Sequence, residues 1–214
     1  DQGAFVLGAL EMLEPACAIS DQARQISDNL TAKGMRVLGF AANQSVTQFD
    51  DESGEPALPP LTLLGIISFS DELRPELHET LTAFAANGVR LKVISGDNPQ
   101  TVAALARQAG MPGNLKAISG TELAEMSPAE FAQAAAEATV FGRVTPQQKE
   151  ALVVALRDQG EHVAMIGDGV NDVLSLKKAN LGIAMESGST ATRSVAAMVL
   201  LGDSFAAMPS ALEE

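Results

Sequence analysis

The stretch 162–172, His-Val-Ala-Met-Ile-Gly-Asp-Gly-Val-Asn-Asp, constrains the fold of this chain more than any other. An apolar run ends there in a Gly-Asp-Gly turn, and a helix is expected directly afterwards, over residues 173–179. A strand that ends in such a turn and leads into a helix places a carboxylate at the C-terminal edge of a parallel sheet. Open α/β folds bind their ligands at that edge. The stretch therefore predicts a ligand site in an α/β protein.

Three polar side chains of this stretch are candidates for the site. Carboxylate oxygens suit Mg²⁺, which takes one or two protein carboxylates and keeps water and substrate phosphate in its other positions. We expect Asp168 to be a Mg²⁺ ligand, and Asp172 to be either a second ligand or a neighbour that supports the first. Asn171 offers an amide to a phosphoryl oxygen. The alternative is a surface turn whose Asp and Asn side chains satisfy backbone donors.

The composition argues against several other classes of function. The net charge of the 214 residues is -13, whereas a nucleic-acid surface needs clustered Lys and Arg. The chain has no Trp or Tyr, so a base-stacking platform is not expected. No apolar run approaches the roughly 20 residues of a membrane helix, and we expect a soluble chain. The single cysteine, Cys17, cannot form an internal disulfide, which fits a reducing compartment.

The sequence pattern changes near residue 70. Residues 1–70 predict a small α+β unit, with a helix that Ser20 caps and a polar loop over 48–60. Strands are expected over residues 3–8, 35–41 and 61–69. The first strand has no earlier strand to pair with, so we expect an incomplete unit with an open strand edge.

Residues 71–214 instead alternate between helices and strands, the pattern of a Rossmann-like parallel sheet with flanking helices. Ser127 and Thr145 each open a capping box that marks a helix start. Helices are expected over 75–87, 99–109, 128–138 and 146–160, and strands over 89–94, 139–141, 163–167, 181–185 and 198–201.

A second polar turn, Ser95-Gly96-Asp97, follows the strand expected over 89–94. We expect this strand end and the one before Asp168 to lie at the same edge of one parallel sheet. A helix N-terminus follows each turn, and its backbone N–H groups and dipole attract an anion. Ser95 can donate its hydroxyl and Gly96 its amide to a phosphoryl oxygen. Asp97 either belongs to this site or only caps the following helix.

Among the cations of the sequence, Lys149 says most about the site, because of its position in a helix. It lies in the first turn of the helix that begins at Pro146, where the helix dipole disfavours a positive charge by roughly 0.3–1 kcal/mol. A phosphoryl group held between this helix and Asp168 would compensate that cost, with the Lys acting as a point charge. The alternative is a solvated surface Lys.

These residues together resemble the cytoplasmic phosphorylation domain of P-type cation-transporting ATPases. The resemblance rests on three stretches in the same order: 95–98, 140–149, and 167–172 with its continuation over 176–179 and 182–185. Residues 71–75 resemble the hinge between the nucleotide-binding and phosphorylation domains, and residues 34–38 resemble a late strand of the nucleotide-binding domain. The resemblance therefore implies the C-terminal part of a nucleotide-binding domain over 1–70 and a phosphorylation domain over 71–214.

The resemblance also implies a fold, ligands and residue roles. It implies a haloacid dehalogenase-like fold, with ATP as substrate and Mg²⁺ as cofactor, on the cytoplasmic face of a cell membrane protein. By position, Asp168 binds Mg²⁺ and Asp172 is assigned both to the metal and, with Asn171, to the phosphorylation site. The residues implied to hold the phosphoryl group are Ser95, Gly96, Asp97 and Lys149. Those implied for the nucleotide are Gly8, Glu11, Arg36, Asp71 and Arg74.

The chain departs from the family pattern in three places, of which the mildest is Ser95, which stands where Thr is usual and keeps the hydroxyl. It contains no Asp-Lys-Thr-Gly-Thr stretch, which carries the family's nucleophile, and Leu7 stands where a Lys begins the family's Lys-Gly-Ala-Pro-Glu motif. We therefore expect a phosphorylation domain without its first strand and phosphorylated Asp, inactive in isolation. Its partners would be ATP, the transported cation and the rest of the pump chain.

Two alternative functions are open at this point. A free-standing phosphatase of the same superfamily would use Asp71 as nucleophile, but that chemistry requires a second Asp two residues later, and residue 73 is Leu. A catalytically inactive module that binds nucleotide or Mg²⁺ is the other alternative.

Overall fold

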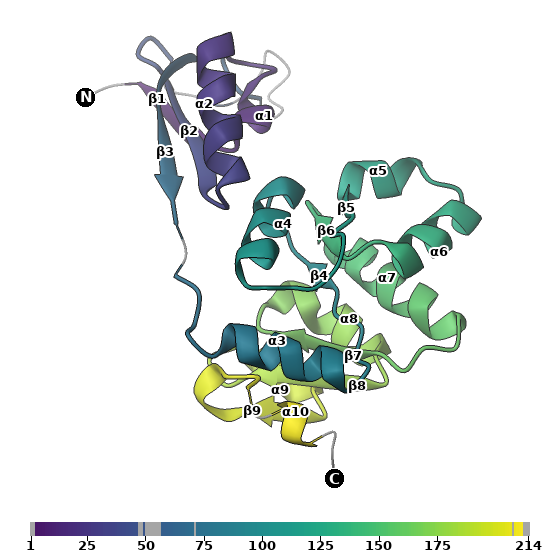
Figure 1. Cartoon of the computed structure of the whole chain (residues 1–214). Helices are drawn as coiled ribbons and strands as arrows, with labels where there is room; N and C mark the ends of the chain where they lie inside the picture. The colour runs from purple at the N-terminus through teal and green to yellow at the C-terminus, as the bar shows by residue number, and fades with distance from the viewer. Residues whose placement is uncertain (1–2, 47–48, 50–56, 71, 207, 212–214) are drawn as a thin grey trace. The chain divides into compact units, whose positions relative to one another are not determined.

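The computed structural model describes residues 3–46, 49, 57–70, 72–206 and 208–211. The chain divides into two compact units, residues 1–72 and 73–214 (Figure 1). Most of the predicted loop over 48–60 and the candidate Asp71 lie outside the described residues.

The first unit is an antiparallel sheet of three strands in the order β1-β2-β3. The strands are β1 (Ala4–Gly8), β2 (Arg36–Asn43) and β3 (Thr62–Phe69). The chain folds β1 back onto β2, so that Ala4 lies opposite Asn43. Strand β1 therefore pairs with a strand that follows it in sequence, and among the described residues it is an edge strand of this sheet.

Two helices pack against this sheet, α1 (Leu10–Leu13) and α2 (Asp21–Ala32). Helix α2 starts where the sequence predicts, with the Ser20 hydroxyl accepting a hydrogen bond from the Ala23 amide. It ends at Ala32, and Gly34, which follows the C-cap residue Lys33, has a positive φ of 78° that suits glycine. The core between helices and sheet is made by Leu10, Leu13, Cys17, Ile19, Ala23, Ala41 and Leu61.

Among its described residues, the second unit contains two parallel sheets of three strands each. The β6 sheet has the order β4-β6-β5, and the β8 sheet has the order β7-β8-β9. Their strands are β4 (Val93–Ile94), β5 (Ala117–Ser119), β6 (Val140–Gly142), β7 (Ala164–Gly167), β8 (Leu181–Met185) and β9 (Met198–Leu200). Parallel pairing throughout, with flanking helices, confirms the α/β class.

The two sheets differ from the expectation in one respect. Within the described residues, β4 pairs only with β6 and β7 pairs only with β8. The strand ends at Ser95 and Asp168 therefore belong to different sheets, and the expectation of one shared sheet is wrong for the described part of the chain. Both β4 and β7 are edge strands.

The helices of this unit begin close to the predicted positions, and a further strand and helix, β5 and α5, were not predicted. Ser119 opens a capping box with Glu122 at the start of α5, a signal that the sequence also contains. The helices are α3 (Leu77–Ala86), α4 (Pro99–Gln108), α5 (Gly120–Glu125), α6 (Pro128–Glu137), α7 (Pro146–Asp158), α8 (Val173–Lys178), α9 (Thr190–Val195) and α10 (Met208–Ala211), with 3-10 turns η1 (Val170–Asp172) and η2 (Leu201–Asp203).

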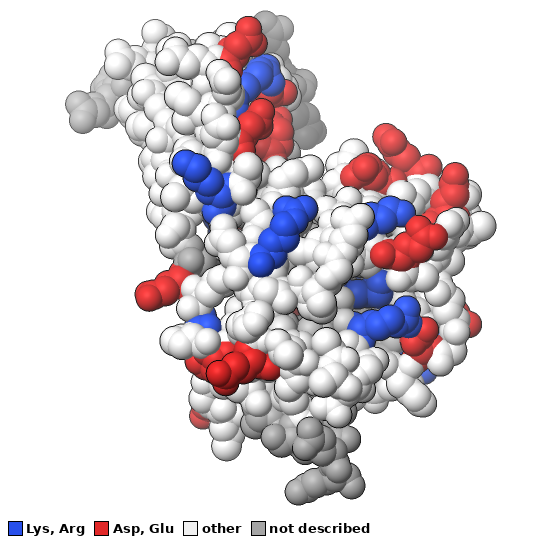
Figure 2. All heavy atoms as spheres, in the orientation of Figure 1, with Lys and Arg blue, Asp and Glu red and all other residues white. Residues whose placement is uncertain are grey.

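Part of the negative charge of the chain gathers over α5 and α6 (Figure 2). Two of the carboxylates there also start helices. Hydrogen bonds from Ser119 lower the pKa of Glu122, and hydrogen bonds from Ser127 lower the pKa of Glu130. These acidic side chains therefore have a structural role at helix N-termini.

Strand β4 is shorter than the predicted strand over 89–94. Only Val93 and Ile94 are in register with β6, and Val93 and Ser95 donate to the carbonyls of Thr139 and Phe141. The preceding Val89 and Leu91 pack instead against a cluster that contains Ile183 of the β8 sheet. The segment thus passes from the core of the β8 sheet to the β6 sheet, and only its last residues can pair.

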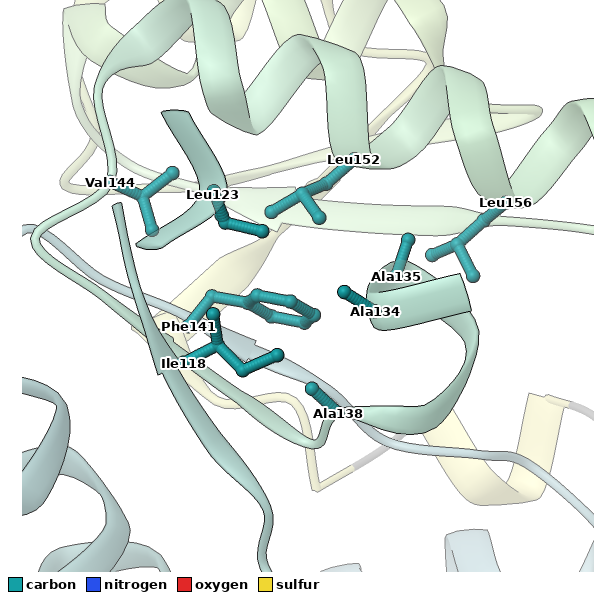
Figure 3. Close-up of a cluster of buried hydrophobic side chains, with 9 residues drawn as sticks. All are labelled: Ile118, Leu123, Ala134, Ala135, Ala138, Phe141, Val144, Leu152 and Leu156. Carbon is teal, nitrogen blue, oxygen red and sulfur yellow. The ribbon is translucent and has the colours of Figure 1, made fainter. Parts of the chain in front are cut away.

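Helix α7 contributes to the cores of both sheets. Leu152 and Leu156 pack around the fully buried Phe141 of the β6 sheet (Figure 3). Val153, on the neighbouring face, packs with Met165 of the β8 sheet. One helix therefore holds the two sheets together and fixes where its own N-terminus lies.

Candidate functional site

The centre of the candidate site is an ion pair between Lys149 and Asp172. The Lys149 Nζ donates to the Asp172 Oδ1 over 2.6 Å, and the two side chains are only 12% and 9% exposed. Lys149 comes from the first turn of α7, and Asp172 ends the turn η1 that follows β7. Lys149 is therefore not a solvated surface residue. The cation that the α7 dipole disfavours is matched by a carboxylate from the β8 sheet.

The turn around Asp168 is built closely around the Asp172 side chain. The second carboxylate oxygen of Asp172 accepts a hydrogen bond from the Gly169 amide over 3.2 Å. A Cβ atom at Gly167 would lie 2.6 Å from the Asp172 Cβ, so no side chain fits at position 167. Both oxygens of Asp172 thus accept bonds from within the chain, and this packing requires glycine at position 167.

Asp168 and Asn171 are exposed at the end of β7, in front of the buried pair. The Asp168 backbone carbonyl accepts hydrogen bonds from the Ser189 amide over 2.7 Å and from the Thr192 hydroxyl over 3.0 Å. The segment after β8 therefore holds the backbone of Asp168 in place. The sequence analysis did not identify Ser189 and Thr192. The Ser-Gly-Ser-Thr run over 187–190 follows a strand end, and this is the signal that marks this segment as a candidate.

The Ser95-Gly96-Asp97 turn is held by the end of the neighbouring strand β6. The Ser95 carbonyl accepts from the Val144 amide over 3.1 Å, and the Asp97 carbonyl accepts from the Arg143 amide over 2.8 Å. Within the turn, the Ser95 hydroxyl oxygen accepts from the Asp97 amide over 3.1 Å. The residue that caps α4 is Asn98, so the alternative that Asp97 caps this helix is wrong.

This turn is connected to Lys149 through a short stretch of chain. Arg143 has a positive φ of 54°, a conformation that redirects the chain after β6. Thr145 then caps α7, accepting a hydrogen bond from the Gln148 amide over 3.2 Å. Lys149 is the next residue. The segment 143–149 therefore links the Ser95 turn of the β6 sheet to the Asp172 carboxylate of the β8 sheet.

The residues fit a hard divalent cation held by one carboxylate. Asp168 has an exposed side chain, whereas both oxygens of Asp172 already accept hydrogen bonds. Among the described residues, no group of three or more His, Cys, Asp or Glu side chains could hold a metal ion. Mg²⁺ does not need such a group, because it is bound by one or two carboxylates together with substrate phosphates and water.

The candidates for nucleotide contacts are distributed over both units. Gly8, Glu11 and Arg36 belong to the first unit, where Glu11 and Arg36 are exposed. Asp71 lies outside the described residues. Arg74 belongs to the second unit, where its Nη1 donates to the Asp203 carbonyl over 2.7 Å. The nucleotide roles of these residues stay predictions.

A family model described as haloacid dehalogenase-like hydrolase matches residues 8–180. The chain is 39% identical, over its whole length, to the calcium-transporting ATPase CtpE of Mycolicibacterium smegmatis and 41% identical to that of Mycobacterium tuberculosis. It is 37% identical over 98% of its length to the cation-transporting ATPase pma1 of Synechocystis. The chain spans about a quarter of the length of these relatives, 26%, 26% and 25%.

These relatives confirm the resemblance to P-type cation-transporting ATPases. Within the part of the chain that the structure describes, no helix combines the length and the apolar character needed to cross a membrane.

Proposed function

We propose that this chain, which belongs to the haloacid dehalogenase-like hydrolases, is part of the cytoplasmic catalytic portion of an ATP-driven cation pump that forms an aspartyl-phosphate. The observation that carries the proposal is the buried Lys149–Asp172 pair behind the exposed Asp168. A cation fixed at this depth, beside a carboxylate suited to Mg²⁺, is the arrangement that phosphoryl transfer requires. The similarity to pumps over the whole chain supports the same conclusion.

Each residue of the site has a distinct role in this proposal. Asp168 would hold Mg²⁺, which when bound offsets the charge of the transferring phosphoryl group. Lys149 acts as a point charge on that group, and Asp172 fixes the direction of the ammonium. Asp172 therefore supports the site through Lys149 and the Gly169 amide.

The turn after β4 supplies neutral donors to the phosphoryl group. Gly96 has open space where a Cβ atom would lie, so a ligand oxygen can approach its backbone closely. The Ser95 hydroxyl oxygen accepts from the Asp97 amide, which leaves its proton for a phosphoryl oxygen. Asn171 is exposed and can donate from its side-chain amide.

The nucleophile in this proposal lies on a strand that pairs between β4 and β7. The 214 residues contain no Asp-Lys-Thr-Gly-Thr stretch. Both β4 and β7 are parallel edge strands within the described residues, and α7 spans the cores behind them. A strand that paired with both would join the two sheets and carry its carboxylate to the edge where the Ser95 and Asp168 turns lie.

The first unit is the C-terminal part of the nucleotide-binding domain in this proposal. Arg36 would contact the nucleotide phosphates, with Gly8, Glu11, Asp71 and Arg74 as the further nucleotide contacts. The whole protein would lie with these domains on the cytoplasmic face of a membrane. The transported ion is a cation, and calcium is the ion in the names of two of the relatives.

Phosphorylation with γ-labelled ATP and an acid quench tests the proposal. We expect the full-length protein that contains this chain to form an acid-stable acyl-phosphate on the Asp of an Asp-Lys-Thr-Gly-Thr stretch. The isolated 214-residue chain should stay unlabelled. Label on Asp71 of the isolated chain would favour the phosphatase, and nucleotide binding without label in the full-length protein would favour an inactive binding module.

A further inference from the structure

The turn between β8 and α9, residues 186–189, and the first turn of α9 pack directly on the backbone of Asp168. The Ser189 amide and the Thr192 hydroxyl both donate to the Asp168 carbonyl, over 2.7 and 3.0 Å. A carbonyl oxygen has two lone pairs, and both are used here. The Thr192 side chain is fully buried, so neither water nor solvent motion competes with its bond.

The hydroxyl network allows the proton of Thr192 to go to Asp168. The Thr192 hydroxyl oxygen lies 3.0 Å from the Asp168 carbonyl oxygen and 2.9 Å from the Ser189 carbonyl oxygen, which also accepts from the Arg193 amide over 3.0 Å. The Ser189 hydroxyl oxygen accepts from the Thr192 amide over 3.1 Å and contacts the Thr192 hydroxyl, to which it can donate its own proton. The Thr192 proton is therefore shared between the carbonyls of Asp168 and Ser189, and the Ser189 amide gives the Asp168 carbonyl its second donor.

The turn is also braced from outside and fits closely. The Arg193 guanidinium donates to the carbonyls of Glu186 and Gly188. A Cβ atom at Gly188 would lie 3.0 Å from the Asp168 carbonyl oxygen and 3.1 Å from its Cα. A side chain at position 188 would therefore push the turn away from Asp168.

We propose that Thr192 and Ser189 are positioning residues that fix the backbone from which the Asp168 carboxylate reaches Mg²⁺. The inference rests on the proposed role of Asp168 and deepens it. A carboxylate on an exposed turn has many orientations, and outer partners that restrict a ligand raise metal affinity by about 10–100-fold. The two bonds to the Asp168 carbonyl fix the peptide group between Asp168 and Gly169. They thereby restrict the backbone that carries the carboxylate.

Mn²⁺ binding to the 214-residue chain, followed by electron paramagnetic resonance, tests this inference without an activity assay. Asp168→Asn first identifies the affinity that belongs to this site. Thr192→Val removes the hydroxyl and keeps the shape, and we expect it to weaken that affinity about tenfold. Thr192→Ser keeps the hydroxyl and should bind Mn²⁺ with the affinity of the unchanged chain. Ser194→Ala, which removes an exposed hydroxyl that bonds to the Ala191 carbonyl in the same helix, should leave it unchanged.

The outcomes separate the two levels of the proposal. If Asp168→Asn leaves Mn²⁺ binding unchanged, Asp168 is not the metal ligand, and the inference fails together with that part of the proposed function. If Asp168→Asn weakens binding but folded Thr192→Val does not, Thr192 is only structural and the inference alone is overturned. Gly188→Ala gives a second route should Thr192→Val not fold. It displaces the turn and should weaken Mn²⁺ binding, and unchanged binding would contradict the inference.

Discussion

Removing Lys149 should destabilise the second unit strongly, because it would leave Asp172 buried without its cation. In Lys149→Met the hydrocarbon part of the side chain is kept and the charge is lost. The pair is 12% and 9% exposed and 2.6 Å apart, so solvent screens it little. Breaking a buried pair of this kind costs about 3–5 kcal/mol, which corresponds to roughly 6–20 °C in the Tm of a domain of about 150 residues.

The chain offers a matched control, a more exposed ion pair that joins α7 to α8. Lys178 of α8 lies 3.6 Å from Glu150 of α7, with side chains 50% and 29% exposed. Lys178→Met should cost less than about 1 kcal/mol, since exposed pairs contribute little. Urea-induced unfolding gives the free energies, and hydrogen exchange of residues 146–178 shows whether the loss lies in this unit.

A double-mutant cycle isolates the interaction itself. In Lys149→Met combined with Asp172→Asn, neither buried charge is left alone, so the double variant should lose less than the sum of the single variants by about 1–3 kcal/mol. The reasoning is refuted if Lys149→Met costs no more than Lys178→Met, or if the two single losses simply add.

Three further predictions concern chemistry, assembly and pH. In the full-length protein, Lys149→Ala should lower phosphoenzyme formation by about 10²–10³-fold, as loss of one preorganised contact does, and Lys178→Ala should not. A synthetic peptide with an apolar run before Asp-Lys-Thr-Gly-Thr should protect the amides of β4 and β7 from hydrogen exchange, and the same peptide with Pro within the apolar run should not. Burial, with the charge of Arg90, lowers the pKa of Lys92 from 10.5 to about 8, so the unfolded chain binds more protons between these values and stability should rise with pH across this window. The urea midpoint at pH 8 and at pH 10 measures that rise, which Lys92→Met should diminish.

Most helix starts could be predicted from sequence because they depend on local chemistry. Ser20, Ser127 and Thr145 each cap the helix that follows, as their side chains and neighbours indicate. The same signal at Ser119 was present and marks the start of α5. Local capping therefore fixes where helices begin, independently of the tertiary fold.

Strand lengths and strand partners could not be predicted in the same way. The apolar run over 89–94 predicts a full strand, but Val89 and Leu91 pack into the core of the β8 sheet and only Val93 and Ile94 pair with β6. The division into two sheets also depends on contacts between distant segments. An apolar run shows that residues are buried but does not show which strand they lie beside.

The candidate site was predicted in its residues and only partly in its connections. Glycines around Asp168 and the cation at the start of α7 gave the position of the site. The burial of the Lys149–Asp172 pair depends on how α7 packs on α8. A pattern of neighbouring residues does not predict this packing, because the two helices are separate segments of the chain. The bonds from Ser189 and Thr192 to Asp168 join residues that are more than twenty positions apart, and the sequence gives no reason to connect them.

Helix α7 gives this unit a mechanical property. Its middle turns lie in the cores of both sheets, through Leu152 and Leu156 on one side and Val153 on the other, and its first turn carries Lys149. A rigid helix cannot follow two sheets that move apart, so any opening between them must tilt it and withdraw the ammonium from Asp172. The distance between the Lys149 ammonium and Asp172 therefore reports whether the two sheets are close together. A ligand that binds the ammonium also stabilises the arrangement in which the sheets are close.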